Sequence, residues 1–215
     1  MAVEALKHLP QAQPRRFVPQ GIDLGDWNQL APLFKRLQED AAKLGSTKDL
    51  EAWVHRCSEL GAAIDQEGSR RHIDHTCQTD DQAAEQAHLH FVEKIEQLLK
   101  PEWQKLDQLF LACPYTKDLQ QGRWNVFVRE TKKDVELFRA ENIPLQTEDT
   151  KLGLQYQKLT GAMTVCFKGK EHTLQQMGRY LEEPDRDLRE VAWQLITYRR
   201  LMDRDRIEQI YDEEL

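Results

Sequence analysis

The chain has 215 residues, 40% of them hydrophobic and 31% charged, and carries a formal net charge of −7. These values indicate a soluble helical protein with a substantial core, and the interspersed acidic and basic residues disfavour sequence-independent binding to nucleic acid. No segment has an apolar run as long as a signal-peptide core or the roughly 20 residues of a membrane span, so we expect a cytoplasmic protein that does not enter a membrane.

Residues 1–20 are expected to form an extended arm, because three prolines interrupt them and they show little periodicity. Residues 21–215 are expected to form one helical domain. Its predicted fold class is mainly α, an antiparallel multi-helix array with one short β-hairpin near residues 163–173. No repeat of roughly 20 to 50 residues is present, so a solenoid is not predicted.

Two capping signals open the helical part. Asp26 and Gln29 form a capping box, and Pro32 either kinks the helix that follows or restarts it. Ser46 or Thr47 caps the next helix. Its apolar stripe recurs at helical spacing and consists of Leu50, Trp53, Val54, Cys57, Leu60, Ala63 and Ile64.

Prolines divide the middle of the chain. A helix that opens at Thr79-Asp80-Asp81 is expected to end before Pro101, which fits the first turn of a separate helix. Residues 124–138 are predicted to form the next helix. Asn142-Ile143-Pro144 then indicates a turn, followed by a helix from about Glu148 to Thr160 that closes at a glycine.

A β-hairpin is predicted where the period of the sequence changes. Met163 to Phe167 alternates as a strand does, Lys168-Gly169-Lys170 can turn, and Glu171 to Thr173 can return. Thr173 and Gln176 form a capping box at the start of a short helix, and Asp185 caps the helix after it.

This succession within residues 161–193 resembles the hairpin and helices that precede the catalytic domain in the oligoendopeptidase F family, which are zinc metallopeptidases related to thimet oligopeptidase. The resemblance extends back to Phe17-Val-Pro and Asp26-Trp27 and forward to Ile210-Tyr211. It implies a helical N-terminal region that helps to wall a deep channel, through which only short, unfolded peptides reach the zinc ion.

The resemblance also implies an absence, because those enzymes bind zinc with a His-Glu-x-x-His helix and a more distant Glu, and this sequence has no such motif. We therefore expect no catalytic, cofactor-binding or metal-binding residues and no peptidase activity from the 215 residues alone. The expected partner is a missing or separate catalytic domain, and oligopeptides are expected as substrates only in the complete enzyme. A truncated gene, a split enzyme and an isolated domain all remain open. The alternative function is a free-standing helical interaction module derived from the same scaffold.

His72-x-x-His75, with Cys77 nearby, is the sequence pattern most similar to a metal site, since imidazoles at i and i+3 of a helix share a face. A metalloprotein built on this pair is the third possibility. We favour solvated residues at a helix end, because the remaining ligands would have to come from generic candidates, namely Asp65, Glu67 and Asp74.

The other polar groups have structural explanations. His88 and His90 point to different faces of a helix, so one is expected at the edge of the core and one in solvent. Glu171-His172 is followed by Thr-Leu-Gln and is not a zinc motif. Glu182-Glu183 are considered for acid and base chemistry, but the turn after them is explained by capping at Asp185.

The cysteines and tryptophans are expected to be core residues. Cys57, Cys77, Cys113 and Cys166 form no Cys-x-x-Cys pair, which predicts reduced thiols instead of a zinc ribbon or redox motif. The five tryptophans lie mostly on apolar stripes, so packing is favoured over ligand stacking.

The C-terminal helix is predicted to continue through Leu195, Tyr198, Leu201, Met202, Ile207, Ile210 and Tyr211 to residue 215 without a stop signal. Its acidic last turn opposes the helix dipole. We interpret this end as cut, and we expect an apolar face that is partly uncovered and that frays, self-associates or binds a separate catalytic chain.

Overall fold

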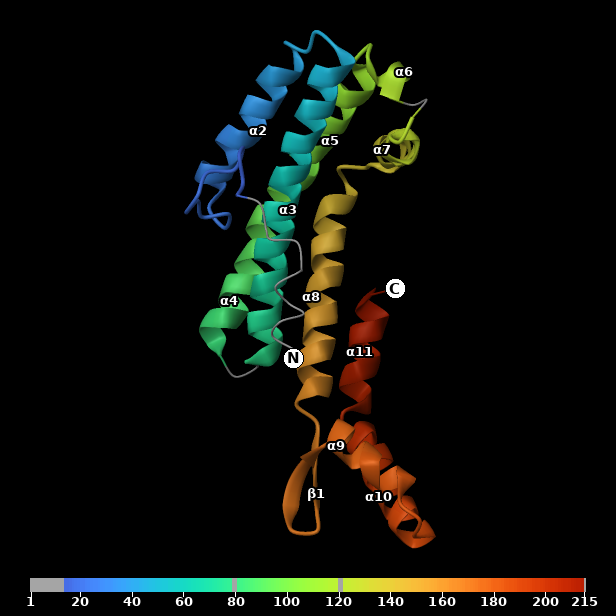
Figure 1. Cartoon of the computed structure of the whole chain (residues 1–215). Coiled ribbons are helices and arrows are strands. Elements are labelled where there is room, and N and C mark those ends of the chain that lie inside the picture. Colours follow the sequence, from blue (N-terminus) through green and yellow to red (C-terminus); the bar gives the residue numbers. More distant parts are fainter. Residues whose placement is uncertain (1–13, 79–80, 120–121, 215) are drawn as a thin grey trace, which may run out of the picture. The chain divides into compact units, whose positions relative to one another are not determined.

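A computed structural model describes residues 14–78, 81–119 and 122–214 of the chain (Figure 1). The protein is mainly α-helical with one two-stranded antiparallel sheet, as the sequence predicts. The chain divides into two compact units, residues 1–140 and 141–215, each of which has its own packing. Among the described helices, none is both long and apolar enough to cross a membrane.

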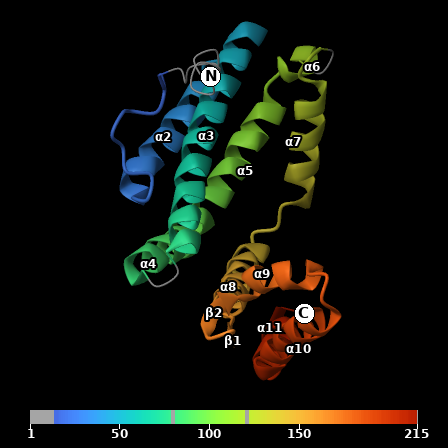
Figure 2. The ribbon, with the colours of Figure 1, turned by 60° about the horizontal axis from the view of Figure 1, so that its bottom comes forward.

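The first unit is a helical array. Its elements are α2 (Trp27–Ala41), α3 (Thr47–Cys77), α4 (Gln82–His90), the π-helix η1 (Phe91–Glu96), α5 (Gln97–Ala112), α6 (Thr116–Leu119) and α7 (Asn125–Leu137). α2 packs against both α3 and α5, and α7 packs against α5. Figure 2 shows α2 and α5 on either side of α3. The helix predicted for residues 124–138 is confirmed as α7.

The long helical run after α3 corrects the prediction of a separate helix at Pro101. Residues 82–112 are helical throughout, with Pro101 inside α5. The π-helical turn η1 lies just before this proline. The ring of Pro101 meets the turn that begins at Gln97, and the helix continues although the proline donates no backbone hydrogen bond.

Asp26 and Ser46 cap the first two helices. The predicted capping box is not formed, because the Gln29 amide oxygen accepts from the N–H of Asp23 and not from that of Asp26. Asp26 accepts a hydrogen bond from the backbone N–H of Asn28 at 2.9 Å, and α2 then continues through Pro32 without a restart. Ser46 caps α3, since its hydroxyl oxygen accepts from the N–H of Asp49 at 3.2 Å. Thr47 is therefore the first residue of the helix and not its cap.

The core of the first unit lies between α2, α3 and α5 and includes Leu30, Phe34, Leu37, Leu50, Trp53, Leu60, Ile95, Leu106 and Phe110. Residues 14–20 of the predicted arm form no helix or strand, but Phe17 and Val18 are buried in this core. The carboxylate of Glu59 accepts hydrogen bonds from both of their backbone N–H groups, at 2.7 and 2.9 Å. The rest of the arm, residues 1–13, lies outside the described residues.

The second unit consists of α8 (Asn142–Gly161), β1 (Thr164–Phe167), β2 (Lys170–Thr173), α9 (Leu174–Gly178), the 3₁₀-helix η2 (Arg179–Glu182), α10 (Arg186–Met202) and α11 (Arg204–Glu214). The predicted hairpin is confirmed, with Thr164 opposite Thr173 and Phe167 opposite Lys170. Lys168 and Gly169 both have positive φ, which is the backbone conformation of a type I′ turn. The capping box of Thr173 and Gln176 is also present.

Two predicted boundaries in this unit are wrong. α8 begins at Asn142, not near Glu148, because Pro144 falls in the first helical turn, where a missing N–H costs nothing. The C-terminal helix is interrupted at Asp203, whose side chain pairs with Arg199. α11 then packs on α8, where the rings of Tyr156 and Tyr211 have centroids 5.6 Å apart.

Candidate functional site

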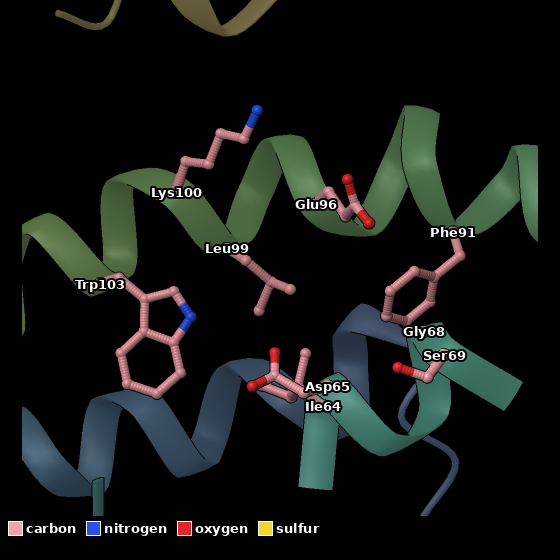
Figure 3. A pocket seen from close by; sticks show the side chains of 9 residues that line it. All are labelled: Ile64, Asp65, Gly68, Ser69, Phe91, Glu96, Leu99, Lys100 and Trp103. Atoms are coloured by element: carbon pink, nitrogen blue, oxygen red, sulfur yellow. The ribbon is translucent and has the colours of Figure 1, made fainter. Parts of the chain in front are cut away.

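A cavity of about 400 Å³ lies between α3 and the run from η1 to α5 (Figure 3). Phe91 and Leu99 project from that run toward α3, and Trp103 projects toward α2, where its ring meets Phe34 edge-on at 5.0 Å. Gly68 leaves the space for the Phe91 ring, since a Cβ atom there would lie 3.0 Å from Cε1 of Phe91. The large apolar side chains of η1 and α5 fit beside α3 because α3 carries small residues opposite them.

The polar groups of this cavity are two carboxylates, one ammonium and one hydroxyl. Burial raises the pKa of Glu96, and the charge of Lys100 opposes that rise. Asp65 lines the α3 side, while the Lys100 side chain points away from α3 (Figure 3). The residues that line the cavity include no pairing of a nucleophile with a histidine base. The lining combines apolar side chains with a few polar groups, which is the usual make-up of a small-molecule binding site.

The structure places a third histidine beside the predicted pair. The ring of His88 on α4 lies 5.3 Å from that of His72 and 5.5 Å from that of His75, centroid to centroid. His72 is solvated as predicted, but His75 is only 7% exposed, which corrects its placement in solvent. Asp65 lines the cavity described above, and Glu67 pairs with Arg71 at 2.9 Å.

The prediction for His88 and His90 is confirmed, because His88 is buried and His90 is exposed. Sequence reasoning missed the contact between His88 and the pair on α3. The signal that could have revealed this contact is the short interval between α3 and α4 in the sequence, because a short connection brings the second helix back along the end of the first. The side-chain Nδ1 atoms of His75 and His88 are buried without a hydrogen-bond partner.

The remaining candidates hold local structure. Asp185 accepts hydrogen bonds from the N–H groups of Asp187 at 2.9 Å and Leu188 at 3.4 Å, so its capping role is confirmed. Glu171 accepts from the Thr164 hydroxyl across the hairpin at 2.6 Å. The ring of His172 meets Tyr180 edge-on at 5.8 Å. Glu182 and Glu183 are exposed.

The prediction that cysteines and tryptophans are core residues is only partly correct. All four cysteines are free thiols, but Cys77 and Cys166 are exposed instead of packed. Burial raises the pKa of Cys57 to about 12, so this thiol stays protonated. Trp53 is buried and donates from Nε1 to the carbonyl of Leu37 at 2.8 Å. Trp193, by contrast, is 59% exposed.

Three exposed apolar residues align along α10. Val191, Tyr198 and Met202 are 44%, 64% and 78% exposed. Their spacing of i, i+7 and i+11 puts them on one line along the helix, and Trp193 lies on the other side. We call these three residues the α10 strip. The expectation of an uncovered apolar face near the C-terminus is therefore met within the described part of the second unit.

Residues 22–138 match the family model described as Peptidase M3 N-terminal domain, and this match spans more than half of the chain. The chain belongs to that family. No curated protein matches its sequence. The chain also shares its fold with longer proteins of known structure.

PZ peptidase A, solved with inhibitor 2, has a TM-score of 0.82 and 19% identity over 93% of this chain and 35% of its own. A protein designated oligoendopeptidase F has a TM-score of 0.82 and 21% identity over 94% of this chain and 35% of its own. A second one, from Bacillus anthracis str. Ames, has a TM-score of 0.82 and 18% identity over 91% of this chain and 36% of its own. The chain thus spans about a third of the length of these proteins and has the fold of the N-terminal portion of an M3-peptidase scaffold.

The M3 peptidases depend on zinc. No His-Glu-x-x-His segment occurs in the 215 residues. Within the ranges that the structure describes, no group of three His, Cys, Asp or Glu side chains is arranged to hold a metal ion. The described residues therefore do not offer the set of ligands that a catalytic zinc site needs.

Proposed function

We propose that the chain is the N-terminal, channel-forming part of an oligoendopeptidase F-like zinc metallopeptidase of the cytoplasm and is inactive by itself. In this role it forms part of the wall of a channel that admits short, unfolded peptides to a zinc ion held by a separate catalytic domain. The family match and the shared fold support this proposal. The observation that carries it is the α10 strip.

The α10 strip is an apolar surface beside the small core of the second unit. Ala192, next to Val191 in the chain, is buried against that core, whereas the strip itself is in water. Apolar surface gains about 25 cal/mol for each Å² that a partner removes from water. We assign an M3-type catalytic domain as the partner that covers the strip.

Sedimentation velocity on the chain, mixed with the separately produced catalytic domain of an M3 peptidase, tests the assignment. We expect a one-to-one complex that Tyr198→Lys weakens at least tenfold, because the substitution puts a charge into the apolar contact. Trp193→Lys is the matched control, since it also replaces an exposed aromatic residue of α10 but lies outside the strip. A monomeric chain with no affinity for the domain would contradict the proposal and favour the free-standing interaction module.

Two measurements on the purified chain test the inactivity. Incubation with a mixture of quenched fluorescent oligopeptides is expected to give no hydrolysis, and metal analysis after dialysis is expected to find less than stoichiometric zinc. Hydrolysis that a metal chelator abolishes would overturn the proposal. One tightly bound zinc ion per chain would instead favour His72 and His75 as ligands.

A further inference from the structure

A second cavity, of about 600 Å³, lies within the first unit and is bordered by α3, α5 and α7. Its α3 wall includes three small residues, Ser58, Gly61 and Ala62, beside larger side chains of the same helix. A Cβ atom on Gly61 would lie 3.7 Å from Cη2 of Trp103, so the small wall is what leaves the indole accessible. This volume is in the range of small-molecule sites.

Aromatic side chains form the opposite wall. Trp103 comes from α5, Phe127 from the first turn of α7, and Trp124 is the residue just before α7. The indole N–H of Trp124 donates to Glu51 at 2.7 Å, which fixes the ring, and Phe127 meets it edge-on at 5.9 Å. The guanidinium of Arg123 already lies 5.0 Å from the Trp124 ring centre. These rings therefore have the electron-rich faces that attract cations.

One carboxylate on the cavity wall has no partner of opposite charge among the residues that the structure describes. Asp107 of α5 is half-buried, and the charged group that acts on it most is the carboxylate of Asp134 on α7. Burial, reinforced by Asp134, raises the pKa of Asp107 from 3.8 to about 6. No described cation forms an ion pair with Asp107. Asp65 adds a third, exposed carboxylate at the end that this cavity shares with the one in Figure 3.

The geometry points to a binding site for an organic cation with a flat apolar body, such as an amidinium, guanidinium or aryl-ammonium group. Asp107 would accept the hydrogen bonds of the cationic head, and Trp103 and Phe127 would contact the body of the ligand. Such a ligand supplies the opposite charge that Asp107 lacks in the isolated chain. This inference does not depend on the proposed function, because it concerns binding to the first unit alone.

Benzamidine is the probe, and benzamide is its neutral control of the same shape. We follow the indole N–H signals of Trp103 and Trp124 by NMR while each compound is added to the 215-residue chain near pH 7.5. Benzamidine is expected to shift both signals in a saturable manner, and benzamide is expected to bind at least tenfold more weakly. Equal binding of the two compounds, or no shift with benzamidine, overturns the inference.

Asp107→Asn keeps the shape of the side chain and removes its charge, and we expect it to weaken benzamidine binding at least tenfold. Asp149→Asn, an exposed change on α8, is the control and is expected to leave binding unchanged. Lowering the pH to about 5 should weaken binding to the wild-type protein, because Asp107 gains a proton. The imidazole of His55 and the thiol of Cys57 also line the cavity, so the pH effect is taken as the difference between wild type and Asp107→Asn. Unchanged affinity in a folded Asp107→Asn variant overturns the assignment.

Discussion

His88 of α4 lies against His75 of α3, with ring centroids 5.5 Å apart and ring planes 20° apart. Burial, with the nearby charges of His72, His75 and Arg71 adding to it, lowers the pKa of His88 from 6.5 to about 4. Between these two pH values the unfolded chain binds a proton that the folded protein does not. The free energy of unfolding therefore falls as the pH drops through this window.

We expect the contribution of His88 to be fully present above about pH 6.5 and to be lost by about pH 4, with a total of about 1 to 3 kcal/mol. Asp107 acts in the opposite direction, since its raised pKa means that the folded protein binds the extra proton between pH 3.8 and about 6. The measurement is urea unfolding of wild type and His88→Phe at several pH values. A drop of the same size in both proteins would show that His88 is not its source.

The contrast between local and distant contacts explains what could be predicted from the sequence. Thr173, Gln176 and Asp185 were identified as capping residues because a cap requires only residues within one helical turn. The meeting of His88 with His75 depends on how two helices pack, and no local pattern specifies that. The same holds for the cavity of about 600 Å³, whose walls come from α3, α5 and α7.

Prolines caused two of the errors at helix boundaries. Pro101 was interpreted as a helix start, but it lies inside α5, in a helical run that begins at Gln82. Pro144 was interpreted as a turn, although it is equally compatible with the first turn of α8. A proline fixes its own φ and removes one donor, so its effect depends on the turn in front of it, which the sequence pattern did not reveal.

Glu59 is expected to hold the segment around Phe17 and Val18 in the core. Burial raises the pKa of Glu59, but hydrogen bonds from the backbone N–H groups of residues 16–18 outweigh this and lower it, so the group is charged at neutral pH. Because hydrogen bonds to charged groups contribute about 1.5 to 3 kcal/mol, Glu59→Ala should lower the free energy of unfolding by an amount in that range. It should also speed tryptic cleavage after Arg16.

The control for Glu59 is Glu39→Ala, which removes only an exposed ion pair with Lys35 at 3.9 Å. Such pairs contribute about 0 to 1 kcal/mol, so little change is expected. Urea unfolding gives the free energies, and the cleavage rate is followed by mass spectrometry. If both variants lose the same stability, the backbone contacts of Glu59 do not anchor the segment.

Asp185→Ala should destabilise the second unit by about 1 kcal/mol, because the substitution leaves the first N–H groups of α10 without their side-chain acceptor. Asp185→Asn retains an acceptor oxygen and should recover most of the loss. Glu190→Ala, an exposed change within α10, is expected to have an effect below about 0.5 kcal/mol. Thermal unfolding followed by circular dichroism distinguishes the three. Equal stability of the Ala and Asn variants would contradict the capping role.

Gly61 and Gly68 both lie inside α3, but they face different neighbours. A Cβ atom on Gly61 would be 3.7 Å from the Trp103 ring, which is an ordinary contact distance. Alanine is favoured over glycine by about 0.8 to 1 kcal/mol inside a helix, so Gly61→Ala should stabilise the first unit by about that amount. A Cβ atom on Gly68 would be 3.0 Å from Cε1 of Phe91.

Phe91 has little room to retreat, because its ring is buried and the Arg71 guanidinium lies 5.6 Å from the ring centre. Overpacking costs about 1 to 3 kcal/mol, so the strain should exceed the helix-propensity gain and make Gly68→Ala destabilising by about 1 kcal/mol. Urea unfolding of both variants shows whether each substitution raises or lowers the free energy of unfolding. The double variant Gly68→Ala/Phe91→Leu should lose less stability than the two single variants lose together, since the smaller side chain removes the clash. A stabilising Gly68→Ala, or strict additivity in the double variant, would show that the Phe91 ring is free to move away.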